Sequence, residues 1–236
     1  VELKSFLAGN DILLMPKDLE LARTKLKGAL RNETITDEQL DYRVRKILMA
    51  KYWLHIDKQG KVETKNLIED LNSIRAEVLR KQLMQSAITL MVNKESVLPI
   101  KDLKDKKFAC ITMGVEQGKE FAKTLSYYDD VDHFSFDGKN GNEILNKLGE
   151  YDKVFVGVYT SNKNPWKSYK IKEDVKLFVK KISLQSSMII TVFANPYSMR
   201  DFKEAELADA VIMGYQNNKE AEQAAAQLIF GGISSK

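Results

Sequence analysis

Residues 188–193 read Met-Ile-Ile-Thr-Val-Phe, and residues 154–158 read Val-Phe-Val-Gly-Val. Each stretch is a short, continuous apolar run in which β-branched side chains are frequent. Runs of this kind are typical of strands that are buried on both faces, and such strands occur in parallel sheets covered by helices. The two runs therefore predict the centre of a parallel sheet.

The same pattern continues on both sides of these runs. Further strands are predicted at residues 108–114, 131–136 and 210–213. Amphipathic helices are predicted between the strands, at residues 116–125, 142–148, 172–183 and 219–230. Alternating strands and helices predict a layered α/β domain with a mostly parallel sheet, here over residues 81–236.

The first part of the chain has a different pattern. Residues 11–16, Asp-Ile-Leu-Leu-Met-Pro, predict one buried strand, and the next strand candidate lies far downstream. We therefore expect this strand to pair with strands that the chain lacks, and the start at Val1 rather than Met suggests a trimmed piece. Helices are predicted at residues 19–30 and 40–48, the second with a capping box of Thr36 and Gln39. Another helix is predicted at residues 66–90.

Composition and charge exclude several classes of function. The chain has 236 residues, of which 44% are hydrophobic and 30% charged, and its formal net charge is +4. The lysines are scattered, so nucleic-acid binding is not expected. No window approaches the roughly 18 apolar residues of a membrane span, and Val1–Lys4 does not open a signal peptide. The single cysteine, Cys110, lies in an apolar run and is expected to be buried and inert.

Five stretches, in order along the chain, resemble glycoside hydrolase family 3. They are Ala8–Pro16, Arg43–Lys51, Ser86–Ile100, Asn195–Tyr197 and Gln223–Gly231. The resemblance implies the tail of a (β/α)8 barrel at residues 1–50, a partly helical linker at 51–80 and the family's C-terminal α/β domain at 81–236. It also implies that the remaining barrel strands lie upstream and that the location is the bacterial periplasm or cell envelope.

The resemblance also locates the chemistry of such an enzyme. A retaining glycosidase needs a carboxylate nucleophile and a proton donor. In this family the nucleophile is an Asp on an earlier barrel strand; Asp11 is not that residue, because it begins its strand and barrel active sites lie at strand C-termini. β-Glucosidase-like members carry an acidic residue in the loop after the strand that matches residues 154–158. Residues 160–169 contain no carboxylate, so no catalytic residue is expected in this chain.

The missing acid favours the branch that resembles β-N-acetylglucosaminidases, which use an Asp-x-His pair on a barrel loop. His55 and His133 do not form that pair, since Trp53 and Val131 stand two residues before them. The predicted function is therefore part of a β-N-acetylhexosaminidase-like hydrolase that removes N-acetylglucosamine from cell-wall-type glycans. Its expected partners are the carbohydrate and the upstream barrel.

Four residues are candidates for binding the sugar. Met15 and Pro16 end the predicted barrel strand on its catalytic side, or simply terminate that strand. Trp166 and Tyr169 offer aromatic faces to a sugar ring, or pack the loop against its own domain. No cofactor is expected, because Gly114 and Gly118 lack the dinucleotide spacing. No metal is expected either, because the acidic residues around His133 are typical of a solvated turn.

Two other functions stay open at this stage. The α/β domain could be a non-catalytic module that braces the barrel or docks a further domain, with a large exposed apolar surface near residues 1–50. The chain could also belong to a β-glucosidase-like protein whose acid is displaced to Glu150, Glu173 or Glu204.

Overall fold

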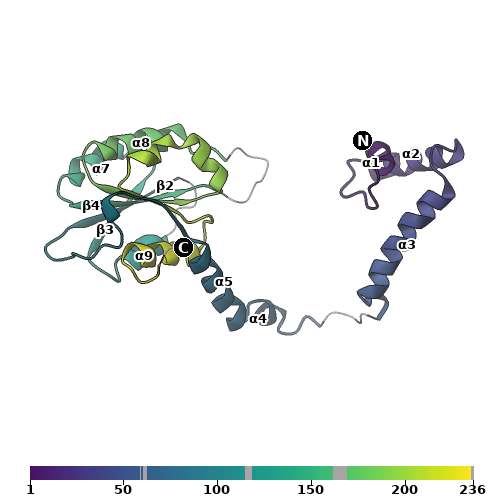
Figure 1. Cartoon of the computed structure of the whole chain (residues 1–236), viewed down its shortest axis with the longest axis horizontal. Helices are drawn as coiled ribbons and strands as arrows, with labels where there is room; N and C mark the ends of the chain where they lie inside the picture. The colour runs from purple at the N-terminus through teal and green to yellow at the C-terminus, as the bar shows by residue number, and fades with distance from the viewer. Residues whose placement is uncertain (59, 61–62, 115–118, 162–168, 235–236) are drawn as a thin grey trace. The chain divides into compact units, whose positions relative to one another are not determined.

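The chain folds as two compact units, Val1–Leu67 and Ile68–Lys236. The computed structural model describes residues 1–58, 60, 63–114, 119–161 and 169–234. Its elements are drawn in Figure 1. Among the described residues, no helix is both long and apolar enough to cross a membrane.

The second unit contains a six-stranded sheet in the order β1-β6-β5-β4-β2-β3. Five strands are parallel: β2 (Phe108–Gly114), β3 (Val131–Phe136), β4 (Lys153–Tyr159), β5 (Met188–Phe193) and β6 (Ala210–Met213). The edge strand β1 (Thr89–Asn93) pairs with β6 in the antiparallel direction. The predicted α/β fold with a mostly parallel sheet is confirmed.

Helices cover both faces of this sheet, as Figure 1 shows. The helices α7 (Gly141–Leu148) and α8 (Glu173–Ser183) bury Ile144, Val175 and Phe178 against one face. The helices α6 (Lys119–Leu125) and α9 (Lys219–Ile229) bury Phe121 and Ala225 against the other. Both sheet faces are therefore apolar, as the continuous apolar strands predict.

The helix predicted at residues 66–90 is wrong in its extent. The segment forms α4 (Leu67–Leu71), then α5 (Ile74–Ala87), which Ser73 caps by accepting the N–H of Ala76. Thr89 and Leu90 belong instead to β1. The error arose because no Gly or Pro separates helix from strand here; pairing with β6, a tertiary interaction, ends the helix.

The first unit is helical, with α1 (Glu2–Leu7), α2 (Leu19–Arg31), α3 (Asp37–Trp53) and the short 3-10 helix η1 (Ile56–Lys58). The predicted capping box is present, because Gln39 N–H donates to Thr36 Oγ1 at 3.2 Å and Thr36 N–H to Gln39 Oε1 at 3.4 Å. The buried core of this unit is small and centres on Phe6, Ala29 and Ile35.

The strand predicted at residues 11–16 is not formed in this structure. These residues make no strand ladder with any described residue, and Met15 has a φ of 49°. A strand needs a neighbour for its backbone hydrogen bonds, and this unit supplies none. The segment is anchored instead by α3, where Arg43 donates to the Asn10 carbonyl at 2.6 Å and Lys46 pairs with Asp11.

One glycine at the end of β2 has no room for a side chain. Gly114 has a φ of +109°, and a Cβ there would lie 2.1 Å from the carbonyl oxygen of Tyr159 on the adjacent β4. We expect Gly114→Ala to lower the unfolding free energy of the α/β unit by about 2 kcal/mol or more, because the contact is with backbone and the φ is strained. Urea denaturation followed by circular dichroism measures this loss.

The matched control is Gly149→Ala, at the C-terminus of α7. Gly149 has a right-handed helical conformation, and a Cβ there meets nothing within 4 Å. We expect this change to leave stability unchanged or raise it by about 0.5 kcal/mol. Equal destabilisation by the two substitutions would contradict the close approach of β2 and β4.

Candidate functional site

The strongest candidate site is a cavity of about 630 Å³ that follows the carboxyl ends of β4 and β5. Five described residues line it: Tyr169, Lys170, Tyr197, Arg200 and Asp201. Ligands of open parallel sheets bind outside the carboxyl ends of the strands, where the connecting loops gather. The position of the cavity therefore agrees with a binding site.

One side of the cavity comes from a short 3-10 helix, η3 (Pro196–Asp201), that follows β5. Asn195 begins it, since its Oδ1 accepts the N–H of Tyr197 at 3.0 Å, and Pro196 occupies the first turn, where a missing N–H costs nothing. The stretch Asn195–Tyr197, one of the five that carry the family resemblance, is thus a helix start. It brings Tyr197, Arg200 and Asp201 onto the cavity wall.

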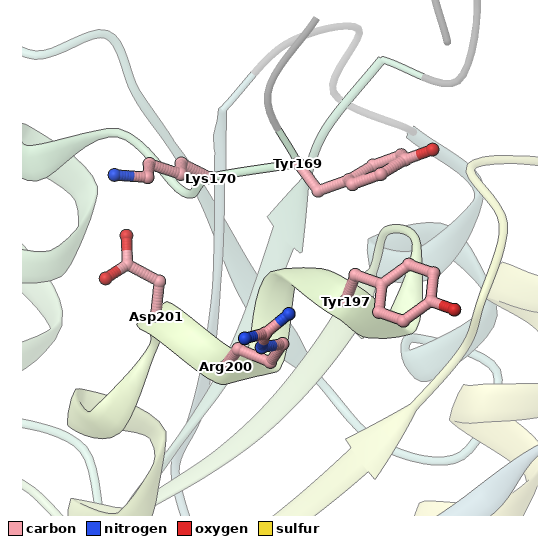
Figure 2. A pocket seen from close by; sticks show the side chains of 5 residues that line it. All are labelled: Tyr169, Lys170, Tyr197, Arg200 and Asp201. Carbon is pink, nitrogen blue, oxygen red and sulfur yellow. The ribbon is translucent and has the colours of Figure 1, made fainter.

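The aromatic part of the cavity is formed by Tyr169 and Tyr197. Their ring centroids lie 5.8 Å apart with an interplanar angle of 39°. Figure 2 shows the two rings on the same side of the cavity with both hydroxyl groups pointing the same way. Tyr169 is 41% exposed and Tyr197 63% exposed, so both rings retain free surface for a ligand.

The charged part of the cavity contains the one carboxylate among its described lining residues, that of Asp201. Lys176, on α8, donates to Asp201 Oδ2 at 3.1 Å and to Glu173 Oε1 at 2.8 Å. The hydrogen bond and charge of Lys176 hold the pKa of Asp201 below its usual value. Asp201 is therefore ionised at neutral pH and is a poor proton donor, because a general acid needs a raised pKa.

None of the three glutamates considered as displaced acids is among the described lining residues of the cavity. Glu150 is exposed in the turn before β4, so it stands at the amino edge of the sheet, roughly 20 Å along the strand from the cavity edge. Glu173 is 79% exposed and paired with Lys176. One carboxylate oxygen of Glu204, on η4 (Lys203–Leu207), is buried away from solvent.

The residues predicted to bind sugar are divided among different parts of the chain. Tyr169 lines the cavity. Trp166 lies outside the described residues. Met15 and Pro16 belong to the first unit, and Met15 is 87% exposed. Sequence reasoning missed Arg200 and Asp201, for which the available signal was a pair of charged residues soon after a buried strand.

No metal centre is found in the described ranges, where no three His, Cys, Asp or Glu side chains gather. His133 Nε2 and Thr112 Oγ1 share a hydrogen bond of 2.9 Å. Burial lowers the pKa of the His133 imidazole. Cys110 is fully buried, and burial raises the pKa of its thiol, which agrees with an inert cysteine.

Many solved structures share this fold. A glycoside hydrolase family 3 β-N-acetylglucosaminidase from Paenibacillus sp. str. FPU-7 matches with a TM-score of 0.74 and 18% identity, over 99% of this chain and 45% of that chain. The β-glucoside phosphorylase BglX bound to 2FGlc matches with 0.73 and 18%, over 99% and 44%. A β-glucosidase from Listeria innocua matches with 0.70 and 18%, over 97% and 35%.

The chain has the fold of family 3 glycoside hydrolases. Its sheet unit corresponds to the C-terminal α/β domain of those proteins, so the predicted resemblance is confirmed at the level of the fold. The chain spans less than half the length of the three proteins. No family model and no curated protein sequence matches it.

A second polar group in the sheet unit is structural rather than part of the cavity. Glu222, on α9, is 3% exposed and accepts the N–H of Phe121 at 2.7 Å, which ties α9 to α6. Burial raises the pKa of Glu222 to about 7, although the Phe121 N–H opposes this shift and nearby Glu120 adds to it. The carboxyl is enclosed, so it helps to hold the helices and does not meet a ligand.

This raised pKa makes stability depend on pH. The native carboxyl binds its proton more tightly than the unfolded one, so its stabilising contribution is complete below about pH 4.5 and is lost as the pH rises towards about 7. Glu222→Gln keeps an acceptor for Phe121 and removes the titration. We expect its stability relative to the unmodified chain to increase between about pH 5 and about pH 8 by on the order of 2 kcal/mol.

Urea denaturation at the two pH values measures this difference. The control is Glu206→Gln, because Glu206 is exposed on η4, and its effect should be the same at both pH values. A pH-independent difference for Glu222→Gln would show that the carboxyl titrates normally in the folded protein.

Proposed function

We propose that this chain is the C-terminal part of a retaining glycoside hydrolase of the β-N-acetylhexosaminidase type. The whole protein would release terminal N-acetylglucosamine from cell-wall-type glycans, and the chain alone would be inactive. The observation that carries the proposal is the cavity at the carboxyl edge of a family 3 fold, whose described lining offers aromatic rings and no carboxyl group with a raised pKa.

The missing proton donor supports the N-acetylhexosaminidase branch. The cavity carboxylate, Asp201, has a lowered pKa, and the segment at residues 160–172 contains no Asp or Glu at all. A β-glucosidase-like protein would need an acid at this place, as the family resemblance implies. Both carboxylates of a retaining mechanism must then come from the barrel that we propose to lie upstream.

Within this protein the α/β domain binds the sugar rather than reacting with it. Tyr169, and Trp166 from the same loop, would stack their rings on the apolar face of a sugar. Met15 and Pro16, in the first unit, would be further sugar-binding residues. In this arrangement residues 81–236 bind the substrate, the barrel cleaves the glycosidic bond, and residues 51–80 link the two.

The first unit supplies the reason for proposing a barrel partner. Helix α3 has no buried residue over its 17 positions. Its exposed apolar side chains include Leu48, Met49, Tyr52 and Trp53, which line an apolar hollow of about 490 Å³ with Arg45 and His55. A single domain rarely leaves so much contiguous apolar surface in water, so this face needs a protein partner. A module that only braces such a partner is the second candidate function.

The deciding experiment compares two aryl substrates with the chain extended upstream by a complete barrel. We expect kcat/KM for 4-nitrophenyl N-acetyl-β-glucosaminide to be at least about tenfold higher than for 4-nitrophenyl β-glucoside. The glucoside lacks the N-acetyl group, and the loss of one group that a pocket is built to bind lowers kcat/KM by at least that factor. The 236-residue chain alone should hydrolyse neither.

Three outcomes would contradict parts of this proposal. Preference for the glucoside would mean that an acid in the α/β domain takes part in the reaction. Hydrolysis by the unextended chain would mean that it holds its own nucleophile. An extended protein that is folded but inactive on both substrates would favour the bracing module.

A further inference from the structure

One cation in the cavity, Arg200, has no counter-ion among the described residues. Arg200 is exposed on η3 and forms no ion pair with any described residue. The adjacent carboxylate, Asp201, is already bound to Lys176 at 3.1 Å. In Figure 2, Asp201 and Lys170 lie on one side of the cavity, the two tyrosine rings lie on the other, and Arg200 stands between them.

Lys176 keeps the Asp201 carboxylate paired. Its side chain is 7% exposed and bridges Glu173 and Asp201, so both of these carboxylates are engaged by one buried cation. Asp201 is thereby directed away from Arg200. A guanidinium beside an uncommitted carboxylate would be neutralised, whereas here it remains available to a ligand.

The described lining of the cavity also has an excess of positive charge. It contains two cations, Lys170 and Arg200, and one anion, Asp201, which Lys176 already pairs. An excess of one charge in a cleft raises the local concentration of ligands of the opposite sign. The described cavity wall therefore favours an anionic ligand.

We propose that this cavity binds an acidic sugar, with the ring on Tyr169 and Tyr197 and a carboxylate on the guanidinium of Arg200. The guanidinium fork matches a planar carboxylate with two parallel hydrogen bonds, while the exposed tyrosine faces accept the apolar face of a pyranose. This inference rests on the proposed function and deepens it, because it assigns to the α/β domain an acidic sugar of the same glycan, distinct from the neutral N-acetylglucosamine that is released.

The test measures binding of small glycosides to the complete 236-residue chain. Methyl β-glucuronide and methyl β-glucoside differ only in the group at C6, a carboxylate in one and a hydroxymethyl in the other. We expect the Kd of the glucuronide, from NMR titration at low salt, to be about fivefold lower than that of the glucoside. This preference should shrink as salt is added.

Three variants assign the preference to its residues. Arg200→Met should abolish the fivefold preference and leave glucoside binding unchanged. Tyr197→Ala should weaken both glycosides, and Lys203→Met, on the neighbouring η4 outside the cavity lining, should change neither. Unchanged amide spectra away from the cavity would show that each variant is folded.

Failure of this inference can be told apart from failure of the proposed function. Equal affinity for the two glycosides, or a preference that survives Arg200→Met, would overturn the acidic-sugar inference and leave sugar binding intact. Tighter binding of glucose 6-phosphate than of the glucuronide would overturn the carboxylate assignment. Binding of no glycoside at all would overturn both this inference and the sugar-binding role of the domain.

Discussion

The burial of β4 on both faces is the constraint on which the rest of the structure depends. Val154, Phe155 and Val156 are completely inaccessible, with alternate side chains packed into the two opposite cores. Such a strand requires helices on both sides and parallel neighbours joined by crossover connections. The connections then meet at the carboxyl edge, and the cavity lies there because β4 and β5 both end there.

The close packing of that edge also explains its small residues. The ring of Tyr159 lies across Gly157 and stacks on Phe193 at 4.7 Å between centroids, and a Cβ at Gly157 would be 2.9 Å from the Tyr159 ring. Glu222 joins α6 and α9 just beyond these rings. These interior side chains are tightly packed, whereas Tyr169 and Tyr197 on the cavity wall are exposed.

Most of the sheet could be predicted because its strands carry their own signal. The runs at β2, β4 and β5 are apolar at nearly every position, and a buried parallel strand is the structure that such a run fits. The edge strand β1 was missed because its residues continue the apolar pattern of α5, and its identity depends on pairing with β6. The strand predicted at residues 11–16 was wrong for the opposite reason, since the described residues offer it no strand to pair with. Tyr169 was predicted from its aromatic side chain in a polar loop, whereas Arg200 and Asp201 join it only through the fold of η3.

We propose sugar binding, and no proton transfer, for the α/β domain. This role depends on the ionisation of one group, because Asp201 is the carboxylate among the described residues of the cavity wall. The direct measurement is the pKa of the Asp201 carboxyl group, followed through its carboxyl carbon by NMR over a pH titration of the whole chain. We predict a midpoint below about 3.9, the usual value for Asp, because Lys176 stabilises the anion. A midpoint above about 5 would place a proton donor in the cavity and would contradict this role.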